Sequence, residues 1–313
     1  MAPRVEEIDA RTAPEAELAA IHRVDEACSW ERPFRTLAES VGQYRHWSDP
    51  VRRRWVARDG DDTVGTAVLM APSPTFAAVH LVVHPDARRR GAGRALYEAV
   101  CAGAREEGIG TFFGHHWGDD GAAFARSAGA VDDQRDVASS LGLRDADLPE
   151  PTLPAGWRLL SWRGAAPAEL VDSYARVRSA MEDAPTPGGL VYGALDADGV
   201  RALERTAAAR GREPRVTVAI DEHGELGAFT DVRTSPAPSP VAGTDDTGTA
   251  PWARRQGLAT AVKLESLRRL RAERPDVEVV RTMNAEGNTA MRAVNTRLGF
   301  VPTAFLTTTV ITL

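Results

Sequence analysis

Two short segments rich in arginine and glycine are the parts of this sequence best suited to chemistry. The first reads VHPDARRRGAGR over residues 83–94, and the second reads TAPWARRQGLA over residues 249–259. Each follows a predicted strand and opens a predicted helix, where unpaired backbone N–H groups and the helix dipole favour an anion. The glycines allow a ligand to approach the backbone closely. Because both copies share one context and spacing, we expect each to form a cradle for a pyrophosphate.

The asparagines are a second feature with chemical potential. The whole chain contains three of them, Asn284, Asn288 and Asn295, and all lie within twelve positions. Asn288 follows a glycine and precedes a predicted helix, so an N-cap is one reading of it. Asn288 and Asn295 also share one face of that helix, which favours a common role.

The elements that would position these residues recur in two similar halves. The proline-containing segment 139–156 is the best candidate for a linker, which divides the chain into residues 1–145 and 146–313. In the first half, strands are predicted at 55–58, 64–70, 77–83 and 109–115, with a helix after the first arginine–glycine segment. The second half repeats this order and ends on an apolar strand at 305–313. Strands, hairpins and helices in this order predict an α/β fold with a mixed sheet in each half.

Composition limits the classes of function that remain. The chain has 313 residues, of which 43% are hydrophobic and 26% charged, as in ordinary globular proteins. Its formal net charge of −6 argues against a general nucleic-acid binder. The two cysteines, Cys28 and Cys101, lack metal-ligand spacing and indicate reduced thiols in a cytoplasmic protein. No segment approaches the ~20 apolar residues of a membrane span, and we expect neither a metal nor a membrane partner.

The R-x-x-G-x-G/A pattern after a strand resembles the acetyl-CoA pyrophosphate loop of the GNAT superfamily of acetyltransferases. The segment TMNAEGNTAMRAVNTRLGF at 282–300 resembles that superfamily's closing helix and LGF turn. With two copies, the chain resembles the tandem GNAT proteins of actinobacteria. The resemblance implies two GNAT-like domains, each with a cleft for acetyl-CoA between two splayed parallel strands.

The resemblance carries a set of cofactor-binding residues onto this sequence. In the first half these are Val82, Val83, Arg88, Arg89, Arg90, Gly91, Ala92, Gly93 and Arg94. In the second half they are Thr249, Ala250, Arg254, Arg255, Gln256, Gly257, Leu258, Ala259, Thr260, Asn284 and Asn288.

The resemblance also implies positions for the catalytic groups. His80 and Asp246 each lie eight residues before the first loop arginine, where family members often carry the general base. Asn295, the third candidate catalytic residue, stands where many relatives carry a tyrosine acid. Because asparagine is a poor acid, either a water protonates the thiolate or this amide only orients the pantetheine. The acidic pair Glu182 and Asp183 could hold a cationic amine or could simply end a solvated helix. Lys263 could meet a cofactor phosphate or face solvent.

These features together predict an acetyl-CoA-dependent N-acetyltransferase that acts on a small-molecule amine. Two alternatives stay open, a protein amine acetyltransferase and a non-catalytic acyl-CoA-binding protein. The second half is favoured for the chemistry because it holds the asparagines, Asp246 and the acidic pair. In the first half, Gly118 and Ala125 stand where Asn288 and Asn295 would fall. The oligomeric state stays open.

Overall fold

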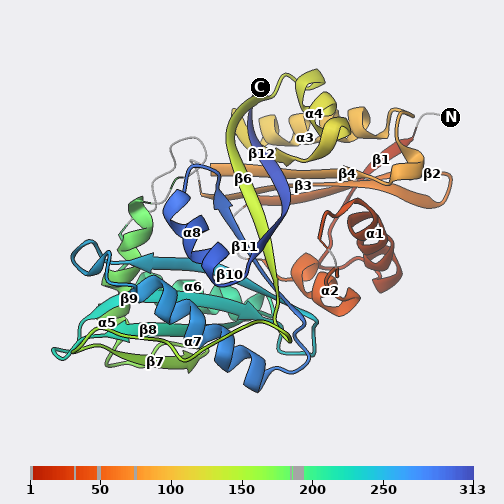
Figure 1. Ribbon diagram of the computed structural model, residues 1–313. Helices are drawn as coiled ribbons and strands as arrows, with labels where there is room; N and C mark the ends of the chain where they lie inside the picture. Colours follow the sequence, from red (N-terminus) through yellow and green to blue (C-terminus); the bar gives the residue numbers. More distant parts are fainter. Residues whose placement is uncertain (1–2, 32, 48–50, 74–75, 184, 186–193) are drawn as a thin grey trace. The chain divides into compact units, whose positions relative to one another are not determined.

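The computed structural model describes residues 3–31, 33–47, 51–73, 76–183, 185 and 194–313. The chain forms two compact units (Figure 1). The amino-terminal unit contains Met1–Arg135 and Leu306–Leu313, and the carboxy-terminal unit contains Asp136–Phe305. Residues 136–145, expected in the first domain, thus lie in the carboxy-terminal unit. Residues 306–313, expected in the second domain, lie in the amino-terminal unit. That division of the sequence into domains remains a prediction.

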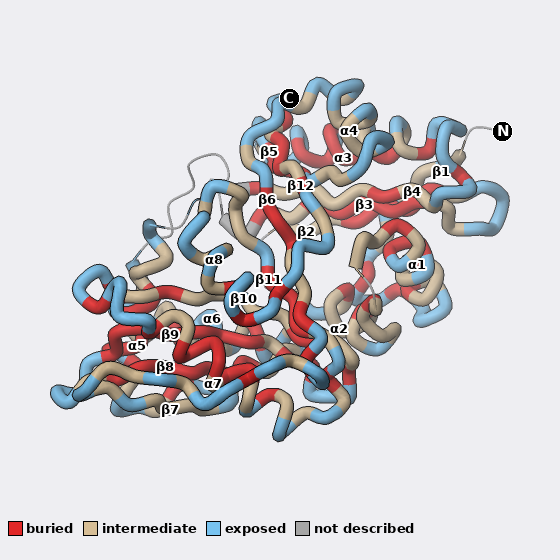
Figure 2. The backbone as a smooth tube through the Cα atoms, in the orientation of Figure 1, coloured by how far each residue is buried: buried red, intermediate tan, exposed pale blue. Residues whose placement is uncertain are grey.

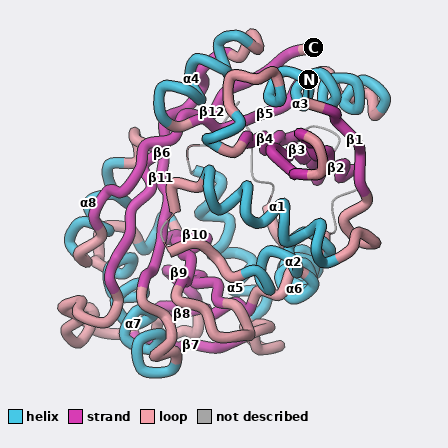
Figure 3. Tube along the Cα trace, turned by 90° about the vertical axis from the view of Figure 1, so that its right-hand side faces the viewer, coloured by secondary structure: helices cyan, strands magenta, loops and turns pink. Residues whose placement is uncertain are grey.

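The amino-terminal unit is a sheet with helices on both faces. Its strands follow the order β1-β2-β3-β4-β5-β12, and only the β4–β5 pair among the registers described here is parallel. Helices α1 and α2 cover one face, and α3 covers the other (Figures 1 and 3). The elements are β1 (Arg4–Ile8), α1 (Glu15–Cys28), α2 (Leu37–Arg45), β2 (Val51–Asp59), β3 (Asp62–Ser73), β4 (Phe76–Val83), η1 (Pro85–Ala87), α3 (Ala92–Glu106), β5 (Thr111–His116), α4 (Gly118–Ser127), β6 (Val131–Gly142) and β12 (Val301–Thr312).

The carboxy-terminal unit repeats this plan. Its strands follow the order β6-β11-β10-β9-β8-β7, with a parallel β10–β11 pair. Helix α7 lies on one side of this sheet, and α5 and α6 lie on the other (Figures 1 and 3). Its remaining elements are β7 (Arg158–Arg163), α5 (Val171–Arg178), η2 (Ser179–Asp183), α6 (Ala197–Ala209), β8 (Glu213–Ile220), β9 (Leu226–Thr234), β10 (Val241–Thr249), η4 (Pro251–Ala253), α7 (Leu258–Glu273), β11 (Val279–Ala285) and α8 (Thr289–Arg297).

Each unit has its own buried core, drawn in red in Figure 2. In the amino-terminal unit, Leu96 and Val100 of α3 pack against Trp55, Leu69 and Phe112 of the sheet. In the carboxy-terminal unit, a second cluster gathers the buried faces of β8, β9, α5 and the start of α7. The helix predicted from the 3.6-residue spacing of apolar residues is therefore present as α3, and these residues bury one face of it on the sheet.

The predicted linker is only partly a linker. Residues 139–142 lie in β6, where Ser139 pairs with Thr282 and Gly142 with Val279 of β11. These residues precede the first proline of the segment, so nothing prevents a ladder there. The segment that follows is held against α7, because Arg268 and Arg271 donate hydrogen bonds to the carbonyl oxygens of Leu148 and Ala146.

Within the described residues, none of the helices combines the length and apolar character needed to cross a bilayer.

Candidate functional site

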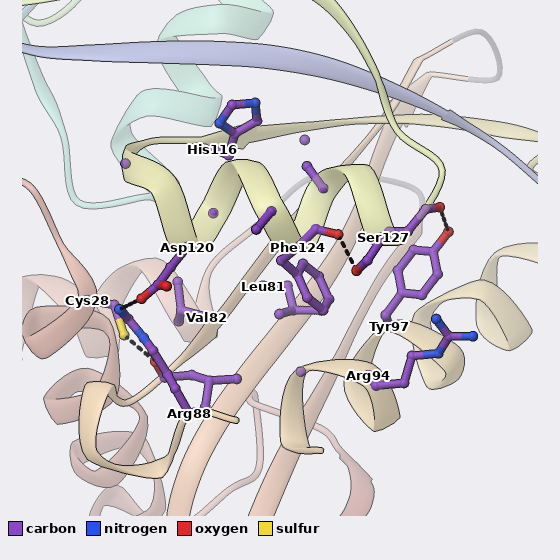
Figure 4. Close-up of a pocket in the computed structure, with 18 of the residues that line it drawn as sticks. Cys28, Leu81, Val82, Arg88, Arg94, Tyr97, His116, Asp120, Phe124 and Ser127 are labelled. Atoms are coloured by element: carbon purple, nitrogen blue, oxygen red, sulfur yellow. Dashed lines mark hydrogen bonds and ion pairs between the residues drawn. The ribbon is translucent and has the colours of Figure 1, made fainter. Parts of the chain in front are cut away.

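The amino-terminal unit has a pocket at the point where its two parallel strands separate. The described parallel pairing of β4 with β5 is at Ala78 and Phe113. A pocket of about 840 Å³ opens beyond it, lined by Val79, Leu81, Val82 and Val83 of β4 and by residues 114–116 of β5. Its other walls are the loop 87–94, the face of α4 and two side chains of β12 (Figure 4). The sequence-predicted cleft between splayed parallel strands is thus present in this unit.

The first arginine–glycine loop forms one end of this pocket. Gly91 has φ +92° and precedes α3, which begins without a side-chain cap, so the first amides of the helix are open to a ligand. A side chain at Gly93 would place its Cβ 3.2 Å from the Phe124 ring, a contact that would require the ring to shift slightly. Residue Arg89 has φ +62°, a strained conformation for a residue with a side chain. These features fit a backbone cradle for an anion.

The second loop has the same backbone conformation. Arg255 has φ +63° and Gly257 has φ +82°, which match Arg89 and Gly91. A short 3₁₀ helix precedes each loop, and a long α-helix follows each with glycine at its N-cap. The two loops that repeat in the sequence therefore also repeat in backbone conformation and in the helices that flank them.

The first arginine of each loop donates a hydrogen bond to the end of the strand that precedes the loop. Nε of Arg88 donates to the carbonyl oxygen of Val83 at 3.3 Å, and Nε of Arg254 donates to that of Thr249 at 3.2 Å. Arg88 also pairs with Asp120 at 3.0 Å (Figure 4). Both arginines hold the end of the incoming strand to the loop.

The other predicted cofactor residues divide between exposed and buried positions. Arg90 and Arg94 are mainly exposed, and Arg94 pairs with Glu98 along its own helix. Val82, Ala92, Ala250 and Leu258 have buried side chains. Of the remaining second-loop residues, Gln256 accepts a hydrogen bond from the Trp157 indole at 3.2 Å, and Ala259 and Thr260 lie in the first turn of α7.

Phe124 and Tyr97 form the apolar wall of the pocket. Their rings meet edge to face with centroids 6.3 Å apart, and the Tyr97 hydroxyl donates to the Ala128 carbonyl at 2.9 Å (Figure 4). On the opposite side, Sγ of Cys28 donates to the Val83 carbonyl at 3.2 Å. His116 lines the pocket and lies 3.3 Å from Asp132. A long ligand with an apolar arm and an anionic end fits this lining.

His80 lies on β4 between two residues that line the pocket, Val79 and Leu81. Its side chain is 42% exposed, and its Nε2 lies 3.3 Å from Oδ1 of Asp25, a carboxylate on α1. Asp25 is buried and accepts a second hydrogen bond from the Tyr44 hydroxyl. His80 therefore combines access to solvent with a buried carboxylate partner.

Asp246, at the corresponding position of the carboxy-terminal unit, has a partner of the opposite charge. The Arg178 guanidinium, on α5, donates to its carboxylate. Arg178 is itself buried and lies close to Asp231, which also pairs with Arg233 at 2.7 Å. Asp246 thus belongs to a dense cluster of charges.

The three asparagines hold one end of the carboxy-terminal unit together. Asn288 is the N-cap of α8, since its side chain accepts from the Met291 amide at 3.2 Å. Nδ2 of Asn295 donates to Oδ1 of Asn284 at 2.7 Å, which ties α8 to β11. Asn295 is 3% exposed, and its own Oδ1 has no hydrogen-bond partner among the described residues. Both N-capping and the Asn–Asn bond explain the clustering in structural terms.

Glu182 and Asp183 end the short helix η2 and are exposed. Asp183 accepts from Nη2 of Arg254 at 2.5 Å, so one member of the acidic pair is engaged by the second loop. Lys263 is buried, and its described contact is with an aromatic ring rather than with an anion. It is 3% exposed, its Nζ lies 5.3 Å above the Phe300 ring, and burial lowers its pKa to about 7.

Sequence reasoning missed Asp25, which contacts His80, and also Tyr44 and Arg54, which lie around Asp25. A signal for Asp25 exists in the chain. It lies on the buried stripe of α1 with Leu18, Ile21, Val24 and Cys28, where an apolar residue is expected. Among the described residues, no three His, Cys, Asp or Glu side chains gather as a metal site requires.

Comparison with known proteins identifies the family. The profile of the acetyltransferase (GNAT) family matches residues 17–125. A mycothiol acetyltransferase from Salinispora tropica is 33% identical over 253 residues, which are 78% of this chain and 76% of that protein. This chain belongs to the GNAT family of acetyltransferases. A second GNAT relative, a mycothiol acetyltransferase from Parafrankia sp., is 30% identical over 78% of this chain and 79% of its own length.

Solved structures of GNAT proteins share the fold. A tandem GNAT protein from the clavulanic acid biosynthesis pathway is 28% identical and superposes with a TM-score of 0.83 over 98% of both chains. A GCN5-related N-acetyltransferase from Sphaerobacter thermophilus, 14% identical, has a TM-score of 0.71 over 98% of this chain and 95% of its own. The predicted family, the mixed α/β fold with two GNAT domains, and the activity as an N-acetyltransferase are confirmed.

Proposed function

We propose that this GNAT protein transfers the acetyl group of acetyl-CoA to the amine of a small molecule, and that the amino-terminal unit does the chemistry. One observation carries the proposal. The pocket between β4 and β5 contains the glycine loop at one end, and His80, on the strand that forms its wall, is backed by a buried carboxylate.

The residues of the pocket fit acetyl-CoA. The amides of residues 90–94 would bind the pyrophosphate, and the walls formed by 79–83 and 114–116 would hold the pantetheine arm. The cofactor would supply an acetyl thioester, an activated acyl donor. The positive φ of Gly91 and the absence of a side-chain cap at the start of α3 support this placement.

His80 would serve as the general base. A primary ammonium has a pKa near ~10, so at neutral pH little of it is nucleophilic until a base removes a proton. An imidazole changes its charge near neutral pH, and a carboxylate behind it stabilises the imidazolium that forms. The carboxylate of Asp246 is instead engaged in an ion pair with the Arg178 guanidinium. The proposal therefore departs from the sequence-based preference for the carboxy-terminal half.

The acceptor class rests on the relatives. Both relatives are named for mycothiol, so we infer a small-molecule amine of a mycothiol-related kind rather than a protein amine. A second anion site at residues 254–260 follows from the matching backbone of the second loop, and we propose that this loop binds a cofactor pyrophosphate without turnover.

The test compares two matched variants, Gly91→Val and Gly257→Val. Both glycines have φ near +90°, so valine strains each loop in the same way. We expect Gly91→Val to abolish CoA release in a thiol assay with a library of small amines, and Gly257→Val to retain it. Loss of CoA release in Gly257→Val alone would contradict the proposal.

A further inference from the structure

Asp25 divides its two carboxylate oxygens between two different donors. Oδ1 lies 3.3 Å from Nε2 of His80, and Oδ2 accepts from the Tyr44 hydroxyl at 2.5 Å. The three side chains come from α1, β4 and α2, so the contact joins both helices of this face to the strand that forms the pocket wall. Asp25 is 5% exposed and Tyr44 is 3% exposed, whereas His80 is the member that reaches solvent.

His80 and, after it, Arg54 keep this buried carboxylate charged. The Arg54 guanidinium is itself 5% exposed and lies 4.6 Å above the Tyr44 ring, with Nη1 donating to Thr66. Burial acts to raise the pKa of Asp25, but the hydrogen bond and charge of His80, the charge of Arg54 and the Tyr44 hydrogen bond lower it to about 2. A charged carboxylate only accepts hydrogen bonds, so the proton in the contact with His80 belongs to the imidazole.

We propose that Asp25 is a positioning residue that holds His80 as the Nε2–H tautomer and leaves Nδ1 as the atom that accepts the proton of the acceptor amine. The inference rests on the proposed function, in which His80 is the base. In the step, one N–H bond of the ammonium breaks and its proton forms a bond with Nδ1. The freed lone pair of the amine becomes the nucleophile, and His80 becomes an imidazolium whose charge Asp25 compensates.

Desolvation weighs against this arrangement as a simple means of packing the core. Burying a carboxylate and a guanidinium together costs desolvation, and apolar residues of the same size would pack there without that cost. The carboxy-terminal unit shows that the fold does not require it, because Asp246 at the matching strand position contacts an arginine of α5 instead. At this strand position His80 therefore has a carboxylate partner, whereas Asp246 has a guanidinium partner.

Several charged or titratable groups lie on the elements packed around the contact between Asp25 and His80. Asp25 is the one within hydrogen-bond distance of His80. These groups are Asp25 and Cys28 of α1, Arg35 between the helices, Tyr44 of α2, Arg54 of β2 and His115 of β5. His115 lies two residues after Phe113, and His80 lies two residues after Ala78, the residue that pairs with Phe113.

The experiment is ¹⁵N NMR of the seven histidines of the full chain, with His80 assigned from the spectrum of His80→Gln. In the unaltered protein above its pKa, we expect His80 to show the Nε2–H pattern. The Nδ1–H pattern would overturn the proposal. In Asp25→Asn, we expect the His80 pKa to fall by about one unit, since an opposite charge at this distance shifts a pKa by ~1–3 units. The acid limb of the kcat/KM profile should move with it.

A second variant covers the case in which Asp25→Asn does not fold. Tyr44→Phe keeps both buried charges and removes one donor to Asp25, so the His80 pKa should rise rather than fall. An unchanged His80 pKa in Asp25→Asn, or a fall in Tyr44→Phe, would overturn the proposal. Glu222→Gln, beside the exposed His223, is the matched control and should leave His80 unchanged.

The same variants separate this inference from the proposed function. If His80→Gln keeps full turnover while Asp25→Asn still shifts the His80 pKa, the assignment of the base is wrong and the pairing stands. If His80→Gln removes turnover while the pKa and tautomer of His80 do not respond to Asp25, the base stands and the positioning role is wrong.

Discussion

His80 and Asp246 occupy equivalent strand positions in the two units. They differ in the charge of the side chain that contacts them from the first helix of the unit. His80 has the buried carboxylate of Asp25, and Asp246 has the buried guanidinium of Arg178. A carboxylate behind an imidazole assists proton uptake, whereas a guanidinium beside a carboxylate opposes it. The two loops share one backbone conformation. Because of this difference in partner, we assign catalysis to the amino-terminal unit and only cofactor binding to the second loop.

Lys263 gives a prediction at the same scale. Burial lowers its pKa in the folded protein from 10.5 to about 7, so between these values the unfolded chain binds more protons and the free energy of unfolding rises with pH. Lys263→Met should remove this slope and stabilise the protein at pH 7 by up to about 4 kcal/mol. Urea unfolding of both proteins at pH 7 and pH 9 measures it. Equal pH slopes in the two would contradict the prediction.

At the scale of elements, β12 matters more to the pocket than its place at the end of the chain indicates. Its residues 307–312 pair with 111–116 of β5, Ile311 lies in the core of the amino-terminal unit, and both Thr309 and Ile311 line the pocket. The sequence shows an apolar strand at 305–313 but not its neighbour, because strand pairing depends on contacts far apart in the chain.

We therefore expect truncation after Phe305 to abolish acetyl-CoA binding in the amino-terminal pocket and to expose the edge of β5. Removal of Leu313 alone is the comparison, since it takes away one partly buried side chain and one amide hydrogen bond to Gly110 but none of the residues of β12 that pair with β5. Isothermal titration with acetyl-CoA measures the stoichiometry. Retained binding by the longer truncation in a protein still sensitive to Gly91→Val would show that β12 is dispensable for the pocket.

At the scale of the whole molecule, local patterns in the sequence predict most of the architecture. The two arginine–glycine loops, the hairpin of β2 and β3 and the helix after each loop follow from spacing and turn chemistry, and the structure has them where expected. The surroundings of His80 do not follow, because Asp25, Tyr44 and Arg54 come from three separate elements. The N-cap role of Asn288 could be read from the sequence, whereas the hydrogen bond between Asn295 and Asn284 could not, because it joins two elements.

The turnover numbers of His80→Gln and Asp246→Asn, measured beside the affinity of each for acetyl-CoA, test the central claim most directly. General-base assistance is worth ~10²–10⁴ in rate, so His80→Gln should lower kcat by at least about tenfold with acetyl-CoA affinity nearly unchanged. Asp246→Asn should change kcat by less than about threefold. A large loss of kcat in Asp246→Asn together with full turnover in His80→Gln would contradict the account and assign the chemistry to the carboxy-terminal unit.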